Sequence, residues 1–112
     1  SLKRFDFEKG TRGYGNDNKD LPATPLHPKV LNFPNLEVLH IEGLLSELPE
    51  DINRLQNLMF ISIPNNPELK SLPESLTELP NLQVLNIRNN PSLKLGPKVQ
   101  AMIDSGDVTV VQ

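Results

Sequence analysis

Three side chains in this 112-residue sequence have the types that hydrolysis would require, namely His40, Glu42 and Ser62. In such a set a base activates a hydroxyl nucleophile. His40 and Glu42 lie two residues apart, so in a strand they share one face, with Ser62 on the next strand of the repeat described below. A flat sheet face supplies neither a dry pocket nor oxyanion donors. We therefore expect no enzyme and no catalytic residues.

A second group of polar side chains is the stretch Asn16-Asp17-Asn18-Lys19-Asp20, which offers oxygen ligands of the kind that Ca²⁺ prefers. Its spacing lacks the ordered ligands, the Gly and the closing Glu of a calcium-binding loop. The chain has no Cys, which excludes a Cys-based zinc site and a disulfide framework. We expect neither a metal nor another cofactor.

The charge and hydropathy of the chain also argue against several classes of partner. The net charge is −3, from 14 acidic and 11 basic residues without a basic cluster, which disfavours nucleic-acid binding. No apolar run approaches the roughly 18 residues of a membrane span, and the start has no signal-peptide pattern. We expect no membrane and no small-molecule substrate. The localisation is not determined: the absence of Cys and of a signal peptide favours the cytoplasm, and a secreted effector remains an alternative.

The strongest pattern is an internal repeat. Segments that begin at Leu36, Leu58 and Leu82, spaced by 22 and 24 residues, have apolar residues at their first, fourth and sixth positions. This alternation predicts strands with one buried face, and the constant offset places successive strands side by side and parallel. Weaker matches assign positions one, four and six to Leu2, Phe5, Phe7 at the front and to Ser105, Val108, Val110 at the back. Five strands are expected, near residues 2–7, 36–41, 58–63, 82–87 and 106–111.

Between the strands, a second apolar pattern recurs. The segments LPEDINRL (48–55) and LPESLTEL (72–79) each begin with Leu-Pro and continue with apolar residues three apart. Pro followed by Glu suits the first turn of a short helix or 3₁₀ segment, with the apolar side chains pointing inward. Weaker versions occur upstream, at Leu26, Val30 and Phe33, and downstream, at Leu95, Val99 and Met102.

Together these patterns resemble the leucine-rich-repeat family, in which L-x-x-L-x-L-x-x-N-x-L recurs every 20–29 residues. The LPxxL phrase is similar to the subtype of roughly 23 residues per repeat found in Ras-group scaffolds, plant immune receptors and some bacterial effectors. The resemblance implies an α/β solenoid with parallel strands on the concave face and short helices or 3₁₀ turns on the convex face. We expect one domain over residues 1–112, and the absence of evident polar caps favours a segment of a longer protein.

Asn66 and Asn90 occupy the ninth position of their repeats. An inward Asn there can satisfy turn backbone groups in a dry interior, so both residues are expected to be structural. The second repeat departs from this pattern, because Leu44 stands near the Asn position and the unit is two residues shorter. The expected asparagine ladder is therefore partial.

The outward strand positions are the candidate binding surface. Val38, Phe60 and Val84 form an apolar column with polar neighbours, as in protein-binding faces. Cross-strand packing on a bare sheet would give the same column, and that alternative stays open. The outward residues are Arg4, Val38, Phe60, Val84 and Asp107 at the third position, Asp6, His40, Ser62, Asn86 and Thr109 at the fifth, and Glu8, Glu42, Pro64, Arg88 and Val111 at the seventh.

The expected function is protein–protein interaction through the concave face, with a protein partner of unknown identity. An insertion near residues 10–25 adds a long loop, in which Arg12 and Tyr14 are possible further contacts. The alternative is a structural spacer or capping segment of a larger multidomain protein, with no binding role of its own. The expected partner-binding residues are Val38, His40, Glu42, Phe60, Ser62, Val84, Asn86 and Arg88.

Overall fold

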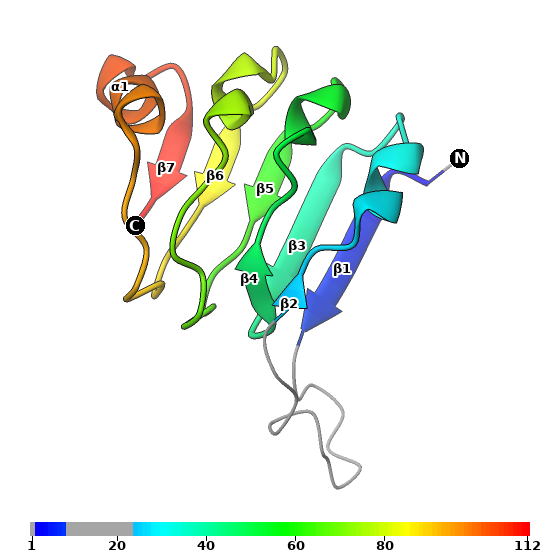
Figure 1. Ribbon diagram of the computed structural model, residues 1–112. Coiled ribbons are helices and arrows are strands. Elements are labelled where there is room, and N and C mark those ends of the chain that lie inside the picture. Colours follow the sequence, from blue (N-terminus) through cyan, green and yellow to red (C-terminus); the bar gives the residue numbers. More distant parts are fainter. Residues whose placement is uncertain (1, 9–23) are drawn as a thin grey trace, which may run out of the picture.

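The computed structural model describes residues 2–8 and 24–112 of the chain. Its main feature is a five-stranded sheet in the order β1-β3-β5-β6-β7, with helical segments along one side (Figure 1). All four strand pairings are parallel, as the repeat predicts. The strands are β1 (Arg4–Glu8), β3 (Val38–Glu42), β5 (Phe60–Ser62), β6 (Val84–Asn86) and β7 (Thr109–Val111).

A short helical segment connects each strand of this sheet to the next one. Three of them are 3₁₀ helices, namely η2 (Pro28–Asn32), η3 (Ile52–Arg54) and η4 (Glu74–Glu78). The fourth is the α-helix α1 (Pro97–Ser105), which has Pro at its first position and ends at Gly106 in the left-handed conformation. Pro at the start and Gly after the end are the residues that best suit those backbone positions. The expectation of short helices or 3₁₀ turns between the strands is thus confirmed.

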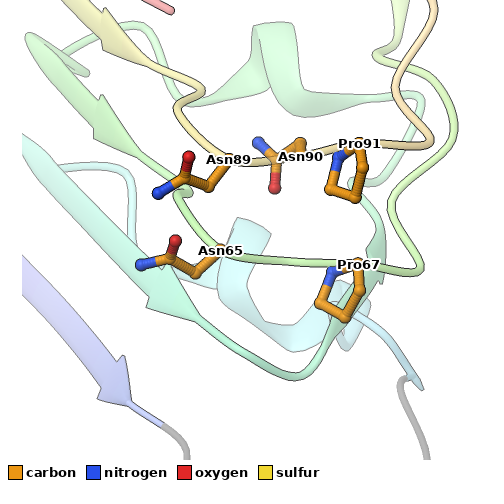
Figure 2. A pocket seen from close by; sticks show the side chains of 5 residues that line it. All are labelled: Asn65, Pro67, Asn89, Asn90 and Pro91. Carbon is orange, nitrogen blue, oxygen red and sulfur yellow. The ribbon is translucent and has the colours of Figure 1, made fainter.

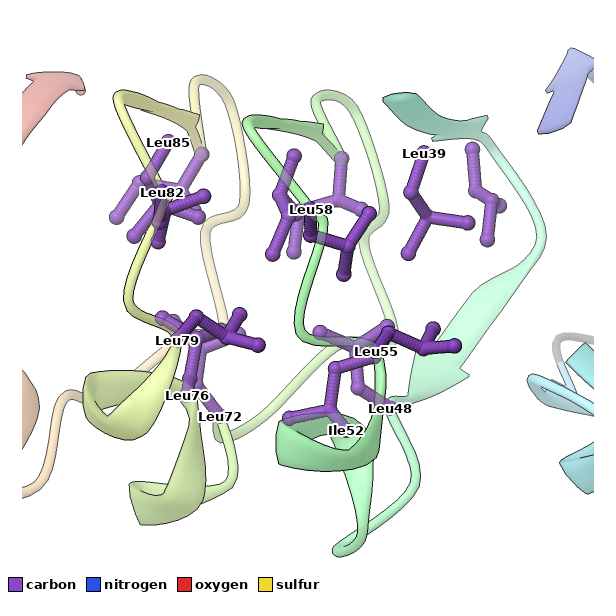
Figure 3. Packing of buried hydrophobic residues seen from close by; sticks show 14 of the residues in the cluster. Leu39, Leu48, Ile52, Leu55, Leu58, Leu72, Leu76, Leu79, Leu82 and Leu85 are labelled. Atoms are coloured by element: carbon purple, nitrogen blue, oxygen red, sulfur yellow. The ribbon is translucent and has the colours of Figure 1, made fainter. Parts of the chain in front are cut away.

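The core is a column of aliphatic side chains between the sheet and the helical segments (Figure 3). The first, fourth and sixth positions of the three interior repeats are all buried, and so are the inward residues of η3 and η4. The predicted inward face is therefore confirmed in these repeats. The fully buried large side chains are Leu36, Leu39, Leu48, Ile52, Leu55, Leu58, Ile61, Ile63, Leu69, Leu76, Leu85 and Val99.

A second, two-stranded sheet was not predicted. It consists of β2 (Thr24–Pro25) and β4 (Leu45–Glu47), which pair in parallel. Gly43, with φ of 97°, turns the chain after β3, so that β4 follows within three residues. This arrangement explains why the second repeat is two residues shorter: its chain returns directly as a strand and has no ladder Asn.

The register of the last strand corrects the sequence assignment. β7 pairs Thr109 with Val84, Val110 with Leu85 and Val111 with Asn86. The fourth position is therefore occupied by Val110, two residues later than predicted. An α-helix rises about 1.5 Å per residue against about 2.0 Å in a 3₁₀ helix, so α1 uses more residues before the chain returns to the sheet.

The first repeat also differs from its expected inward packing. Leu2, Phe7 and Phe33 occupy positions that are buried in later repeats, but they are 40%, 39% and 40% exposed. Phe5 is half-buried against the core. The physical reason is their place in the stack: among the described residues, the first unit has a neighbouring repeat on the β3 side alone.

The asparagine ladder is confirmed as an interior structure. Asn66 and Asn90 are buried, and their side-chain amides donate to strand-end carbonyl groups, among them that of Ile63 from both residues. Asn66 Oδ1 also accepts from the N–H groups of Gly43 and Leu45, so one side chain joins two repeats. These bonds satisfy backbone groups that would otherwise be buried and unpaired.

Among the described residues, no helix has the length and apolarity that crossing a bilayer would demand.

Candidate functional site

The sheet has one surface that points away from the aliphatic core, and we call it the open face. Its first row consists of Val38, Phe60 and Val84, which pair directly in the parallel register. Register partners on neighbouring strands lie about 4.8 Å apart, so the three apolar side chains form one continuous row. Phe60 is 37% exposed and lies at its centre, while both Val residues are half-buried. The predicted outward direction of Phe60 is confirmed.

A second row of polar side chains lies next to the apolar one. His40, Ser62 and Asn86 pair in register across β3, β5 and β6. Asn86 Nδ2 lies 3.4 Å from Ser62 Oγ, and Asn86 Oδ1 accepts the N–H of Arg88 at 3.1 Å. These bonds fix the side chains of Ser62 and Asn86 relative to the sheet before a partner binds.

Glu42 is a fixed carboxylate at the edge of the open face. One of its oxygens accepts from Asn65 Nδ2 at 2.7 Å, and the other lies 3.6 Å from His40 Nε2. Arg88 lies two strands away and is exposed. The two charged groups thus rim the same side of the face with opposite signs. Pro64, expected between them as an outward contact residue, is buried.

The ends of the rows also differ from the prediction. Arg4, at one end of the apolar row, forms an ion pair with Asp6 on the same strand. At the other end the row finishes at Thr109 and the second row at Val111, in place of the expected Asp107 and Thr109. The shift removes the Asp107 carboxylate from the apolar row and moves Val111, already expected to point outward, from the seventh repeat position to the fifth. The β7 end of the face is therefore less acidic than predicted.

The three hydrolytic residue types do lie near one another, but the surroundings are those of a surface. His40 and Ser62 are register neighbours on the exposed side of the sheet, and Asn86 Nδ2 donates to Ser62 Oγ. The described cavities, of about 620, 380 and 220 Å³, are lined by residues other than the eight expected contacts. The face is therefore suited to contact with another surface. Within residues 2–8 and 24–112, no cluster of three or more His, Asp or Glu could hold a metal.

A ledge of asparagine and proline borders the sheet, and sequence reasoning missed it. Asn65 and Asn89 have φ of 58° and 56°, at the repeat position that Gly43 occupies in the second repeat. With Pro67, Asn90 and Pro91 they line a shallow cavity of about 620 Å³, in which corresponding residues of two repeats lie one above the other (Figure 2). The signal was present in the sequence, since Gly and Asn are the residues that best tolerate positive φ.

A second set of repeated asparagines was missed as well. Asn57 and Asn81 each precede the first Leu of a repeat, and their side-chain amides donate to the carbonyl groups of Pro34 and Gln56 in the preceding unit. These bonds are exposed, in contrast to those of the interior ladder. Arg12 and Tyr14, the possible loop contacts, and the stretch from Asn16 to Asp20 lie outside the described residues, as does most of the expected insertion.

Comparison with known proteins supports this description of the fold. No protein-family model and no curated protein matches the sequence. Among solved structures, a leucine-rich-repeat protein of Leptospira interrogans is similar, with a TM-score of 0.60 and 28% sequence identity over 81% of this chain. The chain spans 23% of the length of that protein. The likeness, the parallel sheet and the short helical segments fit an α/β leucine-rich-repeat fold and support that family.

Proposed function

We propose that this chain is a protein-interaction module of a leucine-rich-repeat solenoid, of the LPxxL subtype with roughly 23 residues per repeat, and that it binds a protein partner through the open face. The observation that carries the proposal is the in-register row of Val38, Phe60 and Val84, with an exposed aromatic side chain at its centre. Aromatic residues near the middle of an interface contribute a large share of binding energy.

The polar surroundings of the row support the same function. Interfaces combine an apolar centre with a polar rim, and here the rim contains the fixed carboxylate of Glu42 and the exposed Arg88. Because Asn65 already holds the Glu42 carboxylate, binding would cost little conformational entropy at that group. A leucine-rich-repeat neighbour also suggests a binding module without enzymatic activity, by analogy of fold.

Site-specific photocrosslinking tests the proposal directly. A photoreactive phenylalanine at position 60 should crosslink to one protein in an extract of the native host, and the same group at the exposed Gln83 should not. The purified partner should then bind the chain and lose affinity for Phe60→Ala. Crosslinking of equal yield at both positions, or none at either, would instead favour the spacer or capping segment, which has no binding role of its own.

A further inference from the structure

The apolar surface of the open face is narrow, because it is a single row of side chains. Val38, Phe60 and Val84 form that row, and the row beside it, from His40 to Asn86, is polar. A second sheet packed on this face would need an apolar surface that extends along the strands as well as across them. A helix presents one stripe of apolar side chains. The shape of the apolar surface therefore favours a helix.

The backbone under this row directs its hydrogen bonds within the sheet. β3, β5 and β6 each lie between two other strands, so their N–H and C=O groups point toward those neighbours and not out of the face (Figure 1). A partner segment that lies on the face must therefore satisfy its own backbone groups. An α-helix does so internally, whereas a single extended segment does not.

The spacing of the row also matches a helix. Val38 and Val84 are two strands apart, which corresponds to about 9.6 Å at about 4.8 Å per strand. Two turns of an α-helix, about seven residues, rise roughly 10.5 Å. Helix residues at i, at i+3 or i+4, and at i+7 can thus lie over Val38, Phe60 and Val84 in turn. Alternate side chains of an extended segment are about 6.6 Å apart and lose this match after the first contact.

The charged groups at the rim indicate what the flank of such a helix carries. Glu42 is on β3, and its carboxylate is held by Asn65. Arg88 follows β6 and is exposed. A helix that lies along the apolar row has one flank on the side of these two groups. The complementary flank has a basic residue near Glu42 and an acidic residue near Arg88.

We propose that the partner segment on the open face is an amphipathic α-helix that lies across the strands, along the row from Val38 to Val84. Its apolar stripe covers the row, and its flank carries a basic residue opposite Glu42 and an acidic residue opposite Arg88. This inference rests on the proposed function, and it names the structural element by which the partner binds.

Disulfide trapping measures the conformation of the bound segment. The chain has no Cys, so Val38→Cys and Val84→Cys each introduce a single thiol. The probes are synthetic peptides of the partner segment that a photoreactive group at position 60 captures, each with one Cys at a successive position. A disulfide requires Cβ atoms about 3.5–4.5 Å apart, so trapping reports close neighbours.

We expect the peptide positions that are trapped best by the two variants to differ by about seven residues, as in a helix. A difference of about three residues would indicate an extended segment and would overturn the inference. Trapping by one variant alone would overturn it too, because a helix along the row passes over both positions. If the group at position 60 captures no protein, the proposed function fails and this inference fails with it. Capture followed by the wrong spacing refutes this inference alone.

Proline in the peptide gives a second measurement of helical structure. Pro at a central position that faces away from the chain should weaken binding at least about tenfold, because it breaks the helix. Ala at the same position should leave the affinity unchanged, and fluorescence anisotropy compares the two peptides. Equal affinities of the Pro and Ala peptides would overturn the inference.

Charge reversal tests the flank of the helix. Glu42→Lys and Arg88→Glu should each weaken peptide binding roughly twofold to fivefold, because exposed ion pairs are partly screened. Reversing the facing charge of the peptide should restore the affinity in each case. Unchanged binding by both variants, or a loss that the reversed peptide does not restore, would overturn the charge arrangement proposed for the partner.

Discussion

Asn90 Oδ1 accepts a hydrogen bond from the backbone N–H of Asn66 over 2.7 Å, one full repeat earlier in the chain. Asn66 Oδ1 in turn accepts from Gly43 and Leu45, a further repeat earlier. The amide nitrogen atoms donate to carbonyl groups at the ends of the strands, among them those of Ile41 for Asn66 and Ile63 for Asn90. Two buried side chains thereby connect three successive turns of the chain.

Replacing either asparagine by alanine should destabilise the fold, and Asn66 should matter more. Each loss leaves buried turn groups unpaired, which costs about 1–3 kcal/mol, and Asn66 serves more of these groups than Asn90. Chemical denaturation should place Asn66→Ala toward the upper end of this range and Asn90→Ala toward the lower end. Gln83→Ala is the control, because that side chain is exposed. Equal losses at all three positions would contradict the ladder.

Asn89 tests the backbone conformation of the ledge. Its φ of 56° is in the left-handed region, which costs an ordinary side chain roughly 1–2 kcal/mol. Asn89→Ala should therefore lower the free energy of unfolding by about 1 kcal/mol, whereas Asn89→Gly should stay close to the parent, because Gly tolerates this φ. Thermal denaturation of the two variants decides between this account and a side-chain role, under which both variants would be equally destabilised.

Gly96 tests the start of α1. Glu74 of η4 accepts the N–H of Val99 at 3.1 Å and so caps the helix from the preceding repeat. A Cβ at Gly96 would overlap the carboxylate of Glu74. Gly96→Ala should displace that side chain and cost about 0.5–2 kcal/mol, the usual value of a lost cap. In a Glu74→Ala background the same change should be nearly neutral, and a double-mutant cycle in urea would measure the difference. If Gly96→Ala lowered the free energy of unfolding equally in both backgrounds, the new Cβ would be accommodated while Glu74 still accepts the N–H of Val99.

Leu85 tests the aliphatic column. It is fully buried between the sheet and the helical segments, so Leu85→Ala should cost about 2–5 kcal/mol, through lost burial and the cavity left behind. Val84→Ala, one residue away on the open face, should cost markedly less, because that side chain is only half-buried. Urea denaturation of the two variants compares the two faces of one strand. If Val84→Ala lowered the free energy of unfolding more than Leu85→Ala, the two faces of β6 would have been assigned the wrong way round.

The inward positions of the three interior repeats could be predicted to the residue, and the reason is their strict spacing. The strands themselves begin two residues later than expected, at Val38, Phe60 and Val84. Leu36, Leu58 and Leu82 each start the same alternation, and a slip of one residue would turn an aliphatic face outward. The pattern gives no such protection in the last repeat, where Val108, Val110 and Val111 allow more than one register. Pro97 and Gly106 are the residue types that favour the start and the end of an α-helix. Because α1 contains more residues than the 3₁₀ helices of the other repeats, β7 begins later than predicted.

The apolar row of the open face could also be predicted from the sequence, because it follows from the same repeat spacing. Alternation placed Val38, Phe60 and Val84 outward, and the repeat placed them in one row. It could not show that Pro64 is buried, because the turn that follows this residue depends on the positive φ of Asn65 and on the buried bonds of Asn66, one of them to the Pro64 carbonyl. It also could not show the pairing of β2 with β4, since neither strand has an apolar alternation long enough to recognise.

Kinetics of partner binding should separate the centre of the open face from its rim. Phe60 is an exposed aromatic residue within an apolar row, and its packing against a partner forms only after the first encounter. Phe60→Ala should therefore mainly raise the dissociation rate constant. The free energy of binding should weaken by about 2 kcal/mol or more. The melting temperature of this variant should stay within a few degrees of the parent, since an exposed side chain contributes little to the core.

Arg88 is exposed at the rim and acts at longer range, so Arg88→Ala should mainly lower the association rate constant and weaken its dependence on salt. Surface plasmon resonance at several ionic strengths, with the purified partner, measures both constants. Gln83→Ala, also exposed but uncharged, is the control and should change neither constant. Should Phe60→Ala unfold the chain, the direction of the open face would be wrong. Should Phe60→Ala leave both rate constants and the fold intact, the partner binds at another surface of the chain.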